Sequence, residues 1–370
     1  MKKALIVATV YGFIASFEQN DIKILQSLGY EVWCACNGSE ADGKLKNLNL
    51  HLINIPFSRS PFSKANIRAY KMLKKLICQE KFDLVHCHTP VGGVIGRLAA
   101  FDNVNKIVYT AHGFHFYTGA PMLNWLIYYP IEKCLARKTD ILVTINKEDY
   151  YRAKEYFRAK LVKYIPGIGI DIEKIKNAVH NINKGQKRKE LGIPEDVFLL
   201  LSVGELSTRK NHIEVIRALK ELDIKKNKIY YVICGKGNEE KNLFDYVKKA
   251  NLTEEIHFFG YRTDVIEIMA IADLFIFPSK QEGLPVALME AMAVGLPCLV
   301  SDIRGNCELI KRELSCSMLF SLGRQEEIIN GIQKLRTVNK DRASAENLKI
   351  LQEYSSQRVI EKMTNLYLQV

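Results

Sequence analysis

The feature that most constrains the fold is an alternation of strand-like and helix-like segments along the whole 370-residue chain. A run of apolar residues at 4–10 is followed by helical spacing of apolar residues at 18–28 and by a second strand-like run at 30–35. This order is typical of a βαβ unit in a parallel sheet. We therefore interpret residues 4–10 as a buried first strand and not as a signal peptide, although Lys2 and Lys3 precede them.

The alternation ends once and then restarts. A Gly- and Pro-containing segment at 165–171 and a polar, basic stretch at 177–190 separate two series of strands and helices. The expected strands lie at 4–10, 30–35, 50–55, 82–87, 106–110, 140–145 and 161–165, and then at 197–204, 229–234, 256–259, 274–277 and 297–300. Helices expected at 325–336 and 342–368 complete the chain.

Two such series predict an α/β protein with two Rossmann-like, doubly wound parallel-sheet domains that face each other across a cleft. Ligands bind such sheets beyond the carboxyl ends of the strands, so loops and helix N-termini would line the cleft. The expected parts are an N-terminal domain at 1–165, a C-terminal domain at 166–350 and a last helical segment at 351–370.

Composition excludes several other classes. The chain is 48% hydrophobic and 25% charged, which excludes a largely disordered protein. No apolar run reaches the roughly 18 residues of a membrane span. The nine cysteines form no Cys-x-x-Cys pair and several lie in strand-like runs, which indicates buried thiols in a reducing compartment. We therefore expect a cytoplasmic protein.

The net charge of +12 is concentrated in the N-terminal half. Residues 1–165 hold 23 Lys and Arg against 13 Asp and Glu, whereas residues 166–370 hold 30 against 28. This asymmetry indicates an anionic partner for the first half, such as a nucleic acid, a membrane surface or a phosphorylated substrate, with improved solubility as the simpler alternative.

A basic helix at 64–78 contributes to this charge. Its cations follow helical spacing, with apolar residues on the opposite side, so they lie on one stripe. They are Lys64, Arg68, Lys71 and Lys75. The stripe is either an ordinary solvated face or a docking surface for anionic lipid, and the second interpretation places the protein on the inner face of the cell membrane. No recognition motif supports a nucleic acid partner.

The segment at 279–297 is the most specific in the chain. It follows an expected strand and opens a helix near Pro285, so that Glu282 lies in the loop and Glu290 lies inside the helix. The free amides near Leu284 and Val286 form an anion site at the helix N-terminus. A carboxylate beside that site fits contact with sugar hydroxyls better than contact with phosphate.

This segment, EGLPVALMEAMAVGLP, closely resembles the family 4 retaining glycosyltransferases of the GT-B fold, through the spacing of Glu282 and Glu290. Three further stretches agree with the family in the same order: VHCHTPVGGVIGRLAA at 85–100, TAHGFHFY at 110–117 and SVGELSTRKNHIEVIRAL at 202–219. The resemblance implies a nucleotide sugar donor, with UDP favoured, and a lipid-linked glycan acceptor in bacterial surface polysaccharide synthesis. It implies no metal and no other cofactor, and a C-terminal helix that packs back on the N-terminal domain.

The resemblance also implies roles for single residues. Glu282, His112 and Lys210 would be catalytic, Glu290 would hold the ribose, and Lys210 with Arg209 would neutralise the leaving diphosphate. His88 and His115 would lie on the acceptor side. Further donor-binding positions are Gly12, Gly204, Gly235, Tyr261, Arg262, Gly283, Leu284, Pro285 and Val286.

Two positions depart from the family pattern. Glu205 stands where the family commonly has arginine, and Arg209 is the expected substitute. Gly12 stands alone in the expected loop after the first strand, where the family often has two glycines, so it is either a phosphate-contacting glycine or an ordinary turn residue.

Several alternatives stay open at this point. Each histidine or glutamate taken alone is more often structural than functional. His86, His88, His112 and His115 also allow a zinc site, but no carboxylate–histidine pattern flanks them, which argues against zinc. Sugar-nucleotide 2-epimerases and a non-catalytic membrane-associated subunit are two further functions for the same architecture.

Overall fold

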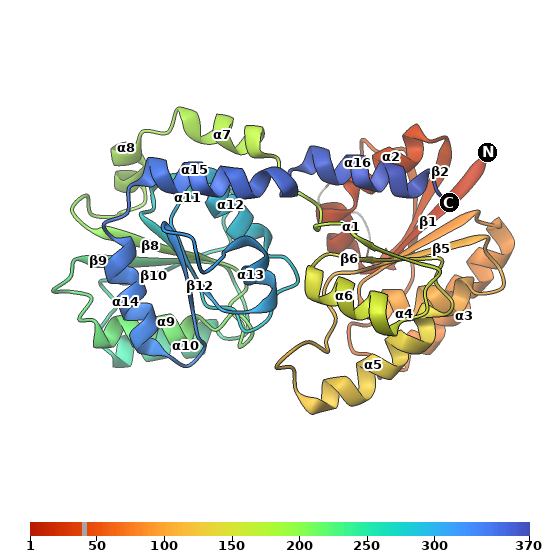
Figure 1. Cartoon of the computed structure of the whole chain (residues 1–370), viewed down its shortest axis with the longest axis horizontal. Coiled ribbons are helices and arrows are strands. Elements are labelled where there is room, and N and C mark those ends of the chain that lie inside the picture. The colour runs from red at the N-terminus through yellow and green to blue at the C-terminus, as the bar shows by residue number, and fades with distance from the viewer. Residues whose placement is uncertain (39–42) are drawn as a thin grey trace. The chain divides into compact units, whose positions relative to one another are not determined.

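The computed structural model describes residues 1–38 and 43–370. These residues form two compact units (Figure 1). Unit 1 comprises Met1–Gly169 and Ser356–Val370, and unit 2 comprises Ile170–Ser355. The chain thus leaves unit 1 at Gly169 and re-enters it at Ser356.

Unit 1 is built on a sheet in which the described residues form seven parallel strands, in the order β3-β2-β1-β4-β5-β6-β7. The inner strand β1 is buried from Ala4 to Thr9, as expected for a parallel sheet covered on both faces. The strands are β1 (Lys2–Val10), β2 (Tyr30–Asn37), β3 (Leu50–Asn54), β4 (Leu84–His88), β5 (Lys106–Ala111), β6 (Ile141–Thr144) and β7 (Leu161–Tyr164).

Two layers of helices cover this sheet. One layer holds α1 (Tyr11–Phe17), α2 (Gln19–Ser27) and the C-terminal helix α16 (Ser356–Tyr367), which packs on α2. The other layer lies on the opposite side of the sheet (Figure 1). It holds α3 (Ala65–Glu80), α4 (Pro90–Ala100), α5 (Met122–Ala136) and α6 (Lys147–Tyr156).

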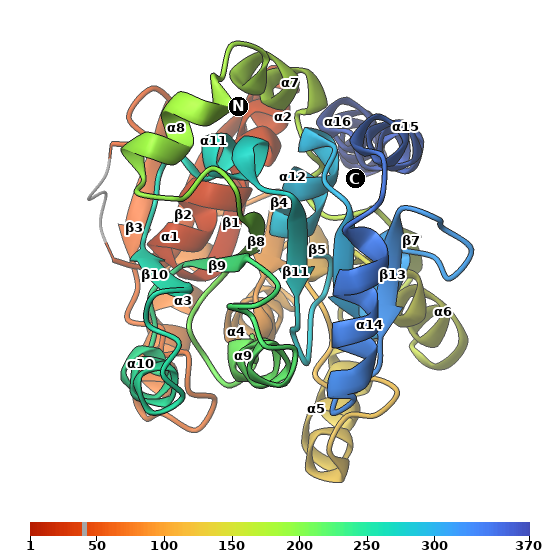
Figure 2. The same ribbon diagram turned by 90° about the vertical axis from the view of Figure 1, so that its left-hand side faces the viewer.

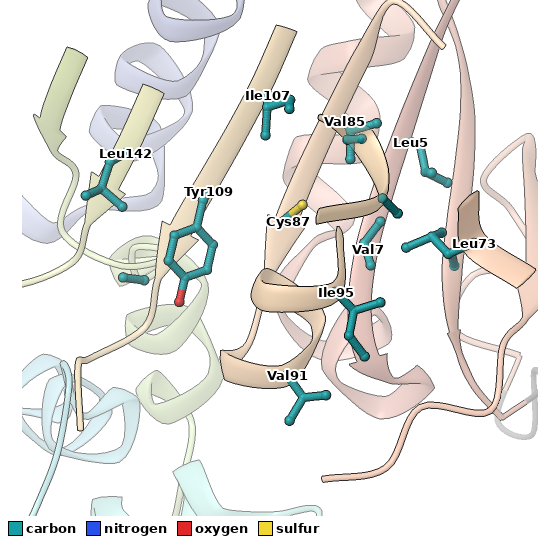
Figure 3. Packing of buried hydrophobic residues seen from close by; sticks show 14 of the residues in the cluster. Leu5, Val7, Leu73, Val85, Cys87, Val91, Ile95, Ile107, Tyr109 and Leu142 are labelled. Atoms are coloured by element: carbon teal, nitrogen blue, oxygen red, sulfur yellow. The ribbon is translucent and has the colours of Figure 1, made fainter. Parts of the chain in front are cut away.

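The core beneath the second layer shows why these segments fold as they do. Leu5, Val7 and Val85 point from the strands toward Leu73 of α3 and Ile95 of α4 (Figure 3). Alternate residues of each strand face the two sides of the sheet, so the buried runs of the sequence supply both cores. Helix α3 buries Ala69, Leu73 and Ile77 at helical spacing and leaves its other faces to solvent.

Unit 2 has a second parallel sheet, in which the described strands follow the order β10-β9-β8-β11-β12-β13. Figure 2 shows β10 and β13 at its opposite edges. The strands are β8 (Phe198–Val203), β9 (Ile229–Cys234), β10 (Ile256–Gly260), β11 (Leu274–Phe277), β12 (Cys298–Ser301) and β13 (Ser317–Phe320).

Helices also cover both faces of the second sheet. One side carries α9 (His212–Glu221), α10 (Glu240–Lys249) and α14 (Gln325–Leu335). The other carries α7 (Ile172–His180), α8 (Lys184–Glu190), α11 (Val265–Ile271), α12 (Val286–Val294) and α15 (Lys340–Leu351). The two doubly wound parallel sheets predicted from the sequence are confirmed.

Two expectations about single elements were wrong, and some elements were not expected. The first strand passes directly into α1, so no loop holds Gly12. The basic stretch at 177–190 is largely helical, in α7 and α8, with Asp171 and Asn183 as N-caps. Helix α13 (Arg304–Leu309) and strand β13 were not anticipated. The single helix expected at 342–368 is interrupted by a 3-10 turn, Gln352–Tyr354, where the chain changes units.

In the part of the chain that the structure describes, no helix is both long enough and apolar enough to cross a bilayer.

Candidate functional site

The predicted donor-binding residues of unit 2 gather at the carboxyl edge of its sheet. Strands β8 and β11 are neighbours in the sheet, and the chain leaves them toward opposite sides of the strand order. A crevice at such a switch point is the usual ligand site of an open α/β sheet. Lys210 follows β8 and Glu282 follows β11, so the fold brings the two side chains together.

An ion cluster forms at this point. The Nζ of Lys210 lies 2.7 Å from Oε1 of Glu282, and Nη1 of Arg209 lies 3.1 Å from the same oxygen. The side chains of Lys210 and Glu282 are only 12% and 10% exposed, and that of Arg209 is 43% exposed. Burial lowers the pKa of Lys210, although Glu282 opposes the shift. The Lys210 ammonium also lies over the ring of Phe277, 4.6 Å from its centre.

The loop that carries Glu282 is supported by residues that the sequence did not single out. Gly305 in α13 packs so closely that an added Cβ would lie 2.8 Å from the Cβ of Glu282. Asn306 donates to the carbonyl and hydroxyl oxygens of Ser301, and the Ser301 hydroxyl donates to the carbonyl of Ser279. A Gly-Asn pair in a short, unrecognised helix gave no sequence signal for this role.

The loop that carries Lys210 is fixed from the other side. Asn211 adopts a left-handed conformation (φ +57°), and its side-chain amide donates to Glu214 in the first turn of α9. The second oxygen of Glu214 accepts from the amide of Gly323. The backbone carbonyl of Arg209 accepts from the amide of Lys280, at 2.8 Å, which ties the two loops together.

Helix α12 places the second glutamate. It begins at Val286 after Pro285, so the amides of its first turn are free of intrahelical partners, as the sequence predicted. Within the described residues the Glu290 carboxylate has no hydrogen-bond or ion-pair partner. Burial raises its pKa to about 7. Such a carboxylate is available to accept hydrogen bonds from a diol.

Glycine after β9 is required for packing. An added Cβ on Gly235 would lie 1.8 Å from the carbonyl oxygen of Gly204, so the loops after β8 and β9 touch only because residue 235 is glycine. Their amides are already donated, that of Gly204 to Cys234 and that of Gly235 to Gly260. A donor contact of these residues stays a prediction, but it does not explain the glycines.

The two predicted residues in the turn after β10, Tyr261 and Arg262, have different surroundings. Tyr261 is 73% exposed and lies at the carboxyl edge of the sheet. The guanidinium of Arg262 is held by Asp264, with its Nε and Nη2 at 2.8 and 2.6 Å from the two carboxylate oxygens. Its side chain therefore has a structural partner, and the predicted base contact would come from the main chain of this turn.

Unit 1 gathers histidines at the carboxyl edge of its own sheet. His88 ends β4 and His112 directly follows β5, with Nδ1 of His88 at 3.1 Å from Nε2 of His112. His88 is 1% exposed, whereas His112 is partly exposed. Phe13 of α1 packs edge-on against the His112 ring. His88, predicted on the acceptor side, thus lies inside the unit behind His112.

Carboxylates join this cluster. Oε1 of Glu18, at the junction of α1 and α2, lies 3.2 Å from Nδ1 of His88. Asp21, the third residue of α2, hydrogen bonds to Glu18 and to the hydroxyl of Tyr367 in α16. That hydroxyl also lies 2.7 Å from Nδ1 of His86. We refer to these residues, Glu18, Asp21, His86, His88, His112 and Tyr367, as the histidine network.

Burial sets the charges of the histidine network. It lowers the pKa of His86 to about 3 and of His112 to about 4, and it lowers that of His88 well below the ordinary value. All three rings are therefore neutral at neutral pH. Burial raises the pKa of Glu18 well above its ordinary value, and Asp21 adds to this shift.

One argument from the sequence was wrong here. No carboxylate was expected beside the histidines, yet Glu18 and Asp21 reach them because α1 and α2 follow the neighbouring strand β1. Two groups of described residues have the spacing for a metal ion: Glu18, His88 and His112, and Asp21, His86 and His88. Nδ1 of His88 hydrogen bonds to His112, and the two ring nitrogens of His86 bond to Tyr367 and Thr110. Nε2 of His88 has no partner among the described residues. His115 lies outside the network and stacks on Tyr128.

Comparison with known proteins shows the family to which the chain belongs. The model of the "Glycosyl transferases group 1" family matches residues 183–349, and that of the "Glycosyl transferase 4-like" family matches residues 4–146. A Bacillus subtilis protein named "Putative glycosyltransferase EpsD" is 36% identical over 99% of this chain and 96% of its own length. The chain belongs to the group 1 glycosyltransferases.

Other comparisons agree with this family. An Escherichia coli UDP-Gal:alpha-D-GlcNAc-diphosphoundecaprenol alpha-1,3-galactosyltransferase is 34% identical over 82% of this chain and 79% of its own length. The crystal structure of Anabaena HepE with UDP and glucose superposes over the whole of both chains with a TM-score of 0.80 at 19% identity. The glycosyltransferase WaaG gives 0.71 over 98% of this chain and 99% of its own. The protein is thus a glycosyltransferase, with the GT-B fold of these neighbours.

Proposed function

We propose that the protein transfers a sugar from a UDP-sugar to a lipid-linked glycan, with retention of anomeric configuration and without a metal ion, in the synthesis of a bacterial surface polysaccharide. The observation that carries the proposal is the ion cluster at the switch point of the second sheet. Two cations and a carboxylate converge there beside the free amides of α12. The named relatives support the choice of donor and acceptor, since one is a UDP-galactose transferase with a diphosphoundecaprenol acceptor.

The ion cluster suits the chemistry of a leaving nucleoside diphosphate. Departure of UDP leaves negative charge on the diphosphate, and stabilising that charge is usually the largest catalytic effect. Lys210 is well placed for this because Glu282, Phe277 and its own burial fix its ammonium before the donor arrives. With the donor bound, Glu282 would turn from its cations toward the sugar hydroxyls. Lys210 and Arg209 would then neutralise the diphosphate in the manner of a bound divalent ion.

Retention follows from attack on the same face that the diphosphate leaves. We assign no covalent nucleophile in the ion cluster, because Glu282 would be directed toward the sugar hydroxyls once the donor is bound. The bond from the sugar to the acceptor oxygen would then form as the bond to the diphosphate breaks, and the acceptor proton would pass to a diphosphate oxygen. His112 of unit 1 would hydrogen bond to the transferred sugar.

The ion cluster is tested by donor binding and by transfer. A thermal-shift panel of nucleotide sugars should show selective stabilisation by one UDP-sugar. Lys210→Ala and Glu282→Gln should each lower kcat by about 100-fold or more, as loss of one charge-stabilising group typically does. Lys220→Ala, on the exposed end of α9, is the matched control and should behave as wild type. Full activity of Lys210→Ala would refute the assignment.

Metal independence is tested separately. Protein treated with a chelator and then dialysed should transfer sugar at the untreated rate, and added Mg²⁺ or Mn²⁺ should not raise it. Retention is tested by the proton NMR coupling of the product anomer, which should match that of the donor sugar. A rate that depends on a divalent ion would contradict the proposed role of Lys210 and Arg209.

A surface of unit 1 supports action at a membrane. The four predicted cations of α3 are all exposed, and Ile67 (61%) and Phe62 (81%) are exposed among them. In the same helical layer, α5 begins with exposed Met122 (72%), Leu123 (64%) and Leu126 (67%), which the sequence analysis did not single out. Cations beside exposed apolar side chains fit the anionic headgroup and acyl boundary of a lipid surface.

Vesicle binding tests this surface. The protein should co-sediment with anionic vesicles at low salt and not with neutral vesicles, and salt should weaken binding. Neutralising the α3 stripe with glutamine should abolish binding, whereas removing four cations from unit 2 should not. The first variant changes Lys64, Arg68, Lys71 and Lys75, and the control changes Lys220, Lys241, Lys248 and Lys249. Equal loss in both variants would indicate net charge alone.

A further inference from the structure

The histidine network contains enough hydrogen bonds to determine where its protons lie. The Tyr367 hydroxyl donates to Asp21 at 2.9 Å, so its oxygen must accept from Nδ1 of His86 at 2.7 Å. His86 therefore carries its proton on Nδ1, and its Nε2 accepts from the Thr110 hydroxyl at 2.8 Å. One end of the network is thus fixed by α16.

The same reasoning reaches His88. Asp21 accepts from Tyr367 and hydrogen bonds to Glu18. The pKa of Asp21 is raised by burial only to about 6, so Asp21 is the ionised partner at neutral pH and Glu18 is the donor between the two carboxyl groups. The raised pKa of Glu18 agrees, since burial and the Asp21 charge both favour its neutral form. A neutral carboxyl keeps an acceptor oxygen, and Oε1 of Glu18 lies 3.2 Å from Nδ1 of His88. His88 therefore carries its proton on Nδ1.

The proton on His88 decides the state of His112. Nδ1 of His88 lies 3.2 Å from Oε1 of Glu18 and hydrogen bonds to Nε2 of His112 at 3.1 Å. Because His88 donates, Nε2 of His112 must accept, and the proton of the neutral His112 ring lies on Nδ1. The buried Nε2 of His88 is left as an acceptor without a protein partner among the described residues. An adjoining cavity of about 30 Å³, lined by His88 and His112, has room for one or two waters.

We propose that Tyr367, Asp21, Glu18 and His88 are positioning residues that hold His112 in its Nδ1–H tautomer, so that His112 offers a hydrogen-bond donor to its ligand and does not act as a base. The use of that donor on a sugar oxygen rests on the proposed function, but the tautomer itself does not. Helix α16 follows the whole of unit 2 in the sequence. Through Tyr367 it thereby helps to set the tautomer of His112, more than 250 residues earlier in the chain.

The tautomer is measured on the free protein by long-range ¹⁵N–¹H NMR after labelling histidine, with His112→Gln to assign the signals. His112 should show a protonated Nδ1 and an unprotonated Nε2. A His112 ring protonated on Nε2 would overturn the proposal, as would a stoichiometric metal ion bound at Glu18, His88 and His112. This measurement needs no substrate, so its result is independent of whether the donor is a UDP-sugar.

Two nearly isosteric variants test the network itself. Glu18→Gln keeps a donor toward Asp21 and an acceptor toward His88, so the His112 tautomer and kcat should be retained. Asp21→Asn replaces one acceptor by a donor opposite Tyr367 and Glu18, so the tautomer should become mixed. Its kcat in sugar transfer should fall at least tenfold with little change in KM. The proposal is overturned if both variants keep the wild-type tautomer, or if Glu18→Gln loses it.

Tyr367→Phe tests the part played by α16. It removes the donor to Asp21 and the acceptor of His86, so the His112 signals should move in the same direction as in Asp21→Asn. Tyr354→Phe removes a tyrosine hydroxyl whose partner is the carbonyl of Glu308 in unit 2, and it should leave the His112 tautomer unchanged. Unchanged His112 signals in Tyr367→Phe would exclude α16 from the network.

Discussion

Burial gives Glu290 a pKa of about 7, which makes donor binding sensitive to pH in the physiological range. The ionised carboxylate accepts two hydrogen bonds from a ribose diol, whereas the protonated group gives up one acceptor. The folded pKa is raised above the unfolded value, so the protonated form stabilises the fold at low pH. This contribution of Glu290 to the free energy of unfolding is lost as pH rises through about 7. Hydrogen bonds from a bound diol would then stabilise the ionised carboxylate.

We expect the affinity for UDP to rise about tenfold between pH 6 and pH 8, since the ionised fraction of a group with a pKa near 7 rises by that factor. Isothermal titration calorimetry at both pH values measures it. Glu290→Gln should bind UDP more weakly at pH 8 and should lack the additional pH dependence. An equal rise of UDP affinity with pH in wild type and Glu290→Gln would assign the effect to ionisation of the UDP phosphate and not to Glu290.

Gly12 gives a test of a predicted donor contact without disturbing the fold. An added Cβ there meets nothing within 4 Å, and Gly12 is the second residue of α1. Gly12→Ala should therefore keep or slightly raise the melting temperature, since alanine favours a helix over glycine by about 0.5–1 kcal/mol. If the backbone of Gly12 approaches the donor, the variant should raise KM for the donor. Unchanged KM would remove Gly12 from the site.

Gly235→Ala provides the contrasting case. Its Cβ would overlap the carbonyl oxygen of Gly204, so the loops after β8 and β9 must separate. We expect a loss of about 1–3 kcal/mol in the free energy of unfolding, as for other overpacked sites, together with weaker donor binding. Urea denaturation, followed by circular dichroism, measures the free energy of unfolding. A stability equal to wild type would show that the loops do not need their close approach.

At the level of residues, the sequence predicted the parts of the site that local patterns encode. The loop and helix around Glu282 and Glu290 follow from the strand, the proline and the helical spacing beside them. The roles of Glu18 and Asp21 do not, because these residues meet His88 and His86 only through the pairing of β1 with β4. Tyr367 is further still, 281 positions from His86, and no local pattern indicates it.

A buried ion pair links two helices of unit 1 at the element scale. Nη2 of Arg97 in α4 lies 2.7 Å from Glu132 in α5, with the Arg97 side chain fully buried. Arg97 also stacks over Tyr109, and its Nε donates to the carbonyl of Gly93. The pair thus fixes α5, whose first turn carries the exposed apolar residues of the proposed membrane surface.

Glu132→Ala should destabilise the protein by about 3–5 kcal/mol, because it leaves the Arg97 charge buried without a partner. Chemical denaturation measures the change. Arg97→Met combined with Glu132→Leu should recover most of it, since both charges are then absent. Asp196→Ala, which breaks an exposed pair with Lys228, is the control and should have little effect. A double variant no better than the single one would contradict this account.

Two of the elements that the sequence missed are short. Helix α13 has six residues and strand β13 has four, too few to show a period. The interruption at 352–355 escapes notice because helical spacing continues on both sides, while the chain passes from one unit to the other. Helices α3 and α14, which have a clear apolar face, were predicted to within two residues.

For the whole molecule, the two units differ in how the chain builds them. Unit 2 is one continuous segment of the chain, whereas unit 1 consists of two segments that are far apart in the sequence. Helix α16 buries Val359, Met363, Leu366 and Tyr367 in the core of unit 1. A fragment of unit 1 that ends at Gly169 would expose the apolar surface that these side chains cover.

We therefore expect a fragment of residues 170–355 to fold alone and to bind UDP with an affinity close to that of the full chain. A fragment of residues 1–169 should be aggregation-prone, and adding a peptide of residues 356–370 should improve its recovery. Circular dichroism, calorimetry and light scattering measure these outcomes. A soluble, cooperatively unfolding 1–169 fragment would show that α16 is dispensable for the fold of unit 1.

The return of α16 to unit 1 has a consequence for biosynthesis. A ribosome that has finished the first 169 residues has made every strand of the first sheet but not the helix that completes its core. The N-terminal half must then wait, partly assembled, while 186 further residues are translated and can fold by themselves. Codon speed and chaperone access during that interval should therefore affect the yield of active enzyme more than the same factors acting on the first sheet.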